Sequence, residues 1–262
     1  FLWTKLSDLL GKKVHDLENL TKKDVKPIEK KLSYSPAREN IVEFGEKLAN
    51  NRNFEEALNV VRIFIHDSDP PIDGSCERHR DLTEGKDSYA IGTVRGRCAW
   101  ILQKFANLHG RKYINEVVSW VKKLSKDNNY YIRLEACIPL IELVKIRHTH
   151  LPREKERFIS EKLAVKIENI TFDMLFDPKN QEIKEIMKYL SMVFSYMRTL
   201  GTKKAKRVLK IFLSSKFNEV AIEITPLLVF YALFRKDAFR NWPWKKLDEF
   251  NSDEIKKLVE EQ

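Results

Sequence analysis

Chemically reactive side chains concentrate in one short stretch of the sequence, HDSDPPIDGSCERHRD, which begins at His66. Within it, Cys76 and His79 have the Cys-x-x-His spacing found in zinc sites, and His66 would supply a third ligand. A nearby carboxylate would complete four-coordination: Asp69, Asp73 or Asp81. Structural zinc sites usually have two close ligand pairs and this stretch has one, so the zinc site is a weaker candidate than a polar loop with a surface thiol.

The adjacent residues His66 and Asp67 suggest a second kind of chemistry, a metal-dependent hydrolase built from helices. Such a site needs a further His upstream and an Asp downstream, on separate helices. The only upstream histidine is His15, in a short segment with weak helical periodicity. Because Pro70 and Pro71 stop a helix, we expect this pair to end a helix and not to hold a catalytic ion.

Composition favours a helical protein without a cofactor. The chain has 262 residues, 43% of them hydrophobic, but only 8 Gly and 9 Pro, so the turns of a many-stranded sheet are scarce. It contains no phosphate-binding glycine loop and no nucleophile-elbow motif. Three cysteines fit a reducing, cytoplasmic compartment, and no apolar run is long enough to span a membrane. The chain starts at Phe1 and not at Met, so we expect a fragment of a longer protein.

Hydrophobic residues recur with the 3.6-residue period of amphipathic helices along most of the chain. One such apolar stripe consists of Ile114, Val117, Val118, Val121 and Leu124. The predicted helices cover 2–10, 16–22, 36–50, 54–66, 88–108, 111–125, 129–148, 152–170, 180–199, 202–215, 217–235 and 252–261. Pairs of helices joined by short turns are the recurring unit.

Two of these helix pairs match each other in sequence. TVRGRCAWIL (93–102) aligns with YIRLEACIPL (131–140), which places Arg95 on Arg133, and AIEITPLLVF (221–230) gives a weaker third match. Repeats of about 40 residues that each contain a helix pair predict a solenoid.

An Asp-containing turn precedes each aligned segment, with Asp67 or Asp69 in the first and Asp127 in the second. This order of helix, Asp turn and helix opening with Val-Arg resembles the HEAT-repeat family. The resemblance implies an all-α, right-handed α-α superhelix of stacked antiparallel helix pairs. Asp and Arg at these positions are expected to pair within and between neighbouring repeats, which makes them structural. We assign to this ladder Asp69, Arg95, Asp127 and Arg133.

The predicted organisation is a single helical-repeat domain over 1–262. Residues 1–50 form an N-terminal helical cap, and 54–148 carry the clearest repeats. An insertion of about 18 residues, 70–87, is longer than most connections, and such loops often contact a partner. Residues 152–262 are expected to add further helix pairs and a C-terminal cap.

Positive charge is concentrated in one region. The chain has a net charge of +10, and residues 145–216 contain 17 Lys and Arg against 8 Asp and Glu. Within this region 202–215 predicts a helix with an apolar stripe on one side and basic residues elsewhere. These basic residues are the candidates for binding an anion or nucleic acid: Lys203, Lys204, Lys206, Arg207 and Lys210.

The sequence therefore predicts a non-enzymatic helical-repeat scaffold that binds another macromolecule, with a protein as the expected partner. The alternative is a DNA-binding HEAT-like protein that uses the basic region 145–216. A metal-dependent hydrolase using His66 and Asp67 is less favoured than either. No cofactor, metal or membrane is expected, and the sequence does not predict the oligomeric state.

Overall fold

The computed structural model describes residues 19–70, 93–107, 111–148, 160–197 and 202–217, together with residues 200, 220 and 224. These residues form helices and no strand, which confirms the all-α prediction. They belong to two compact units, Phe1–Glu142 and Leu143–Gln262. The predicted helices 2–10 and 252–261, and most of 217–235, lie outside the described residues.

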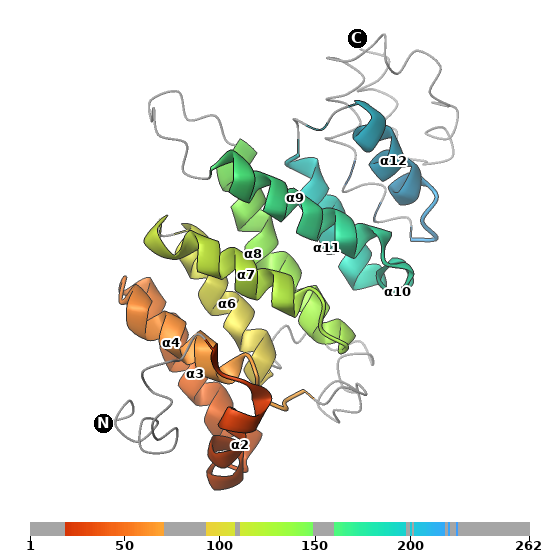
Figure 1. The fold of residues 1–262 in the computed structure, drawn as a ribbon. Helices are drawn as coiled ribbons and strands as arrows, with labels where there is room; N and C mark the ends of the chain where they lie inside the picture. The colour runs from red at the N-terminus through yellow and green to blue at the C-terminus, as the bar shows by residue number, and fades with distance from the viewer. Residues whose placement is uncertain are drawn as a thin grey trace. The chain divides into compact units, whose positions relative to one another are not determined.

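In the first unit the described helices follow one another in chain order (Figure 1). They are α2 (Lys22–Lys31), α3 (Ser35–Asn50), α4 (Phe54–Phe64), α6 (Val94–Asn107), a 3-10 turn (Arg111–Tyr113), α7 (Ile114–Leu124) and α8 (Tyr130–His148), which crosses into the second unit. Helix α3 packs on α4 and α6, and α6 packs on α4 and α7. Taking the helices in chain order, we refer to α2 with α3, α4 with α6, and α7 with α8 as successive helix pairs, each with a first and a second helix.

The predicted apolar stripes form the core of these pairs. All five stripe residues of α7, from Ile114 to Leu124, are buried. Helices α3 and α6 approach closely at Gly45, where an added Cβ would lie 2.8 Å from Ile101 Cδ1 and 2.9 Å from Val60 Cγ1. Glycine is required here because a larger side chain would overlap the neighbouring core.

Helix α2 differs from the prediction, which placed a helix over 16–22. The helix begins at Lys22 because the Asp24 carboxylate accepts hydrogen bonds from the backbone N–H (2.9 Å) and hydroxyl (2.7 Å) of Thr21. This is the N-terminal signature in which an acidic side chain reaches back to the cap. Pro27 and the many lysines obscured the periodicity, since only Val25 and Ile28 of this helix are buried.

The second unit contains α9 (Glu161–Phe176), α10 (Pro178–Gln181), α11 (Lys184–Ser195) and α12 (Thr202–Leu213). The hydroxyl of Ser160 accepts the N–H of Leu163 at 3.3 Å, which caps α9 in a way typical of serine. Helix α9 packs on α10 and α11. Among the described helices of the chain, none is long and apolar enough to cross a membrane.

Candidate functional site

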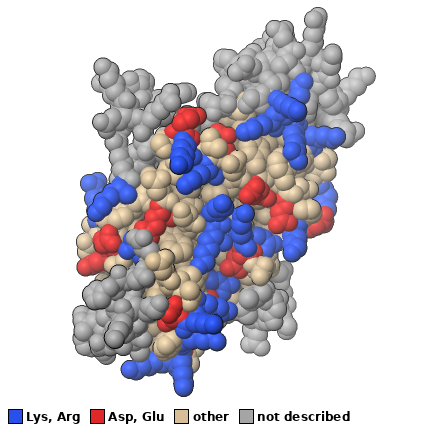
Figure 2. All heavy atoms as spheres, in the orientation of Figure 1, with Lys and Arg blue, Asp and Glu red and all other residues tan. Residues whose placement is uncertain are grey.

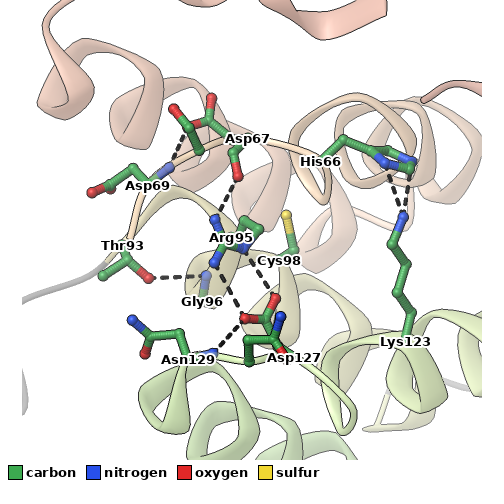
Figure 3. Close-up of polar contacts among 12 residues, drawn as sticks. His66, Asp67, Asp69, Thr93, Arg95, Gly96, Cys98, Lys123, Asp127 and Asn129 are labelled. Carbon is green, nitrogen blue, oxygen red and sulfur yellow. Dashed lines mark hydrogen bonds and ion pairs between the residues drawn. The ribbon is translucent and has the colours of Figure 1, made fainter. Parts of the chain in front are cut away.

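Arginine side chains join the turns of successive helix pairs in the first unit, as Figure 3 shows for Arg95. Arg38 of α3 donates to both carboxylate oxygens of Asp67, at 2.7 and 3.0 Å, and these side chains are 4% and 0% exposed. Arg95 of α6 donates to both oxygens of Asp127, at 3.2 and 3.3 Å. In each case an arginine in the second helix of one pair binds the aspartate in the turn of the next.

Arg38, Arg95 and the equivalent arginine of α8, Arg133, also bind backbone carbonyls in the turn of their own pair. Arg95 donates to the carbonyl oxygen of Asp67 at 2.6 Å, and Arg133 donates to that of Asp127 at 2.8 Å. Arg38 makes the matching contact with its own turn, at Leu32 and Ser33. We call this set, formed by Arg38, Asp67, Arg95, Asp127 and Arg133, the turn ladder.

One residue of the predicted ladder has a different role in the structure. Asp69, which the repeat alignment assigns to the ladder, accepts the backbone N–H of Val94 at 3.0 Å and so caps the start of α6. The carboxylate that meets an arginine is Asp67, which also accepts the N–H of Asp69 at 2.9 Å. Asp127 accepts the N–H of Asn129 at the same distance. The i to i+2 bond fixes which aspartate faces the arginine.

The ladder leaves Asp67 unsuited to metal chemistry. Both carboxylate oxygens accept bonds from Arg38, and one also accepts the N–H of Asp69. Burial raises the pKa of Asp67, although these hydrogen bonds lower it. The carboxylate is therefore held inside the fold, away from any substrate.

His66 lies beside this ladder and faces a positive charge. The Nζ atom of Lys123 is 2.9 Å from Nδ1 and 3.1 Å from Nε2 of His66, and the ring of Trp120 meets the imidazole edge to face. Burial and the charge of Lys123 together lower the pKa of His66 to about 4. A metal ion at this imidazole would meet the lysine ammonium group, which opposes binding.

The other proposed zinc ligands, Cys76 and His79, lie outside the described residues. Within the described ranges, no group of three His, Cys, Asp or Glu side chains is placed to hold a metal ion. The described cysteines, Cys98 and Cys137, are buried. Burial raises the pKa of both thiols, so they remain protonated and pack as small apolar groups.

Further polar contacts join equivalent helices of neighbouring pairs. Between the first helices α4 and α7, Arg62 donates to both oxygens of Glu116 at 2.7 Å. Between the second helices α3 and α6, Arg97 pairs with Glu39 at 3.2 Å. The sequence analysis did not identify these contacts, because charged residues on separate helices carry no signal of which helix they face.

A half-buried carboxyl group, that of Glu135 on α8, contacts the neighbouring second helix. The indole N–H of Trp100 on α6 donates to Glu135 of α8 at 2.8 Å. Burial raises the pKa of Glu135 to about 7, although the bond from Trp100 and the charge of Arg97 lower it. Groups that titrate near neutral pH are often functional, and this one also connects two successive helix pairs.

The predicted basic helix is α12, which has an apolar side and a basic side as the sequence indicates. The apolar stripe is fully buried: Ala205, Val208, Leu209 and Phe212. Lys204 lies 3.7 Å from Glu168 of α9, and the guanidinium carbon of Arg207 lies 3.9 Å from the ring centroid of Phe176. Figure 2 shows Lys and Arg side chains gathered where α12 lies in Figure 1.

Comparison with known proteins adds no family assignment. No protein-family model matches the chain, and no curated protein matches it in sequence.

Proposed function

We propose that this chain is a HEAT-like, non-enzymatic scaffold that binds another protein. The observation that carries the proposal is the turn ladder, in which successive helix pairs are joined by the same connection. A repeated connection between neighbours is what a solenoid needs, since each repeat contacts only the adjacent ones.

Contacts between turns, between first helices and between second helices support side-by-side stacking of the helix pairs. The turns are joined through Arg95 and Asp127, the first helices through Arg62 and Glu116, and the second helices through Trp100 and Glu135. Each contact connects one pair to the next pair along the chain. This pattern favours the right-handed superhelix of antiparallel helix pairs that the HEAT resemblance implies.

The buried charges of the first unit support a structural role over a catalytic one. Catalysis needs titratable groups directed at a shared space that a substrate can enter. In the part of the chain that the structure describes, the carboxylates of Asp67 and Asp127 bind arginines, and the two cysteines are buried thiols. These groups hold helices together.

The surface that fits a protein partner best is the solvent-accessible side of the second helices α6 and α8. It is formed by half-buried residues of α6 and α8, which we call the second-helix face: Arg97, Trp100, Lys104, Glu135 and Ile138. Partly exposed Trp and Arg side chains that are already held in place are typical anchors of protein interfaces, because little side-chain entropy is lost on binding.

Affinity capture with the whole chain, followed by reconstitution with the purified partner, tests this proposal. We expect a complex of defined stoichiometry whose dissociation constant rises at least ten-fold in Ile138→Ala. The control Lys47→Ala alters an exposed residue of α3 and should leave binding unchanged. Saturable turnover of a substrate by the purified chain would overturn the scaffold proposal. A complex that both variants form equally well would overturn the assignment of the face.

A further inference from the structure

The basic side of α12 differs from the charged sites of the first unit in how its cations are paired. Arg38 and Arg95 are each matched with a buried or half-buried carboxylate. Among the described residues, by contrast, no carboxylate pairs with Lys203, Arg207 or Lys210. These cations occupy positions i, i+4 and i+7, so they lie on one side of the helix.

Arg207 is held by an aromatic surface. Its guanidinium carbon lies 3.9 Å from the ring centroid of Phe176, and that ring stacks on Phe172 with centroids 5.7 Å apart and an angle of 17° between planes. A ring contact orients the guanidinium through its flat face and leaves the N–H donors directed outward. Lys204 contacts Phe172 in a similar way, at 5.3 Å from the centroid.

We propose that this side of α12, which we call the cationic row and which consists of Lys203, Arg207 and Lys210, binds the phosphate backbone of nucleic acid. Over seven residues a helix rises about 10 Å, which matches three steps of about 3.4 Å from one phosphate to the next along one strand. Lysines in the first turn oppose the helix dipole, and a bound phosphate relieves that repulsion.

The burial of α12 argues against a membrane surface as the ligand. An interfacial helix inserts its apolar face among lipid chains. In α12 that face is already used by the core, since Val208, Leu209 and Phe212 are 0% exposed. The row therefore offers charge without an apolar anchor, which suits a hydrated polyanion. This inference does not depend on the scaffold proposal, because it concerns the second unit only.

The test is fluorescence anisotropy with the whole chain and a labelled 20-base-pair DNA duplex, titrated between 50 and 200 mM salt. The wild-type affinity should fall steeply as salt rises. The variant Lys203→Gln/Arg207→Gln/Lys210→Gln should bind at least ten-fold more weakly at 100 mM salt, and its log–log salt slope should be shallower by about 2.7, or 0.9 for each lost phosphate contact.

The matched control variant also removes three positive charges, but from the first unit. Lys22, Lys23 and Lys26 are exposed residues of α2, and changing all three to Gln should leave affinity and slope nearly unchanged. Equal weakening in both variants would mean that net charge alone drives binding and would overturn the proposal. Absence of duplex binding by the wild type would also overturn it, as would equally tight binding of polyglutamate or of phosphatidylserine vesicles. Far-UV circular dichroism checks that each variant is folded.

Discussion

The ion pair between Arg38 and Asp67 offers the sharpest test of the turn ladder. In Arg38→Met the apolar stem of the side chain is retained, but the Asp67 carboxylate, which is 0% exposed, loses both bonds from the guanidinium. Water cannot replace them without opening the fold. Breaking a buried pair from one side costs about 3–5 kcal/mol, because the remaining charge is left buried and uncompensated.

Two comparison variants isolate this effect. Lys47→Met breaks the ion pair between Lys47 and Glu43, two side chains that are 67% and 42% exposed. This change should lower the free energy of unfolding by about 0.3–0.5 kcal/mol. The double variant Arg38→Met/Asp67→Asn removes both buried charges and keeps an oxygen that can accept the N–H of Asp69. It should therefore be more stable than Arg38→Met alone.

The assay is urea denaturation of the whole chain followed by circular dichroism, at pH 7.5 and pH 5. Burial raises the pKa of Asp67, and Arg38 opposes this rise. Without Arg38 the folded-state pKa lies further above the unfolded value, so stability is gained as pH falls and lost as pH rises. The deficit of Arg38→Met should thus be smaller at pH 5. A loss no larger than that of Lys47→Met at pH 7.5 would refute the argument that this pair is a buried structural connection.

Three further predictions follow from the packing and the titratable groups. Gly45→Ala should lower the free energy of unfolding by about 1–3 kcal/mol in thermal denaturation, because the clash outweighs the gain of about 1 kcal/mol in helix propensity; a more stable variant would contradict the close approach of α3 and α6. The pKa of Glu135 is raised to about 7, so the stability that it contributes is complete below about pH 4 and is lost as pH rises to 7. Glu135→Gln should flatten that part of the pH profile measured by urea denaturation, whereas Glu43→Gln should not. Finally, NMR titration of His66 should give a pKa near 4 that increases in Lys123→Met; an unchanged value would show that Lys123 does not act on the ring.

Several elements of this fold could be predicted from sequence because burial leaves a periodic pattern. The apolar stripes of α7 and α12 are recognisable at i, i+3, i+4 and i+7, and all their members are buried. Arg95 and Arg133 could be placed in equivalent positions because the segments around them align. Local patterns of this kind need no knowledge of the neighbouring helices.

Other features depend on contacts that the sequence does not encode locally. In HDSD, either aspartate is near enough to meet an arginine, and only the turn geometry selects Asp67 over Asp69. The contacts of Trp100 with Glu135 and of His66 with Lys123 join residues 35 and 57 positions apart. For the zinc hypothesis, Cys76 and His79 lie outside the described residues, so the proposed ligand set stays a prediction.

The turn ladder also marks a point where the chain tolerates added length. Arg133 reaches the carbonyl of Asp127 across 6 residues, whereas Arg95 reaches that of Asp67 across 28. The same bond forms in both turns, and Asp69 and Val94 join the two ends of the longer one. For protein engineering, this turn is a natural place to graft a reporter domain or a binding peptide, since the register of the neighbouring helices is set by the bonds at its base and not by the length of what lies between.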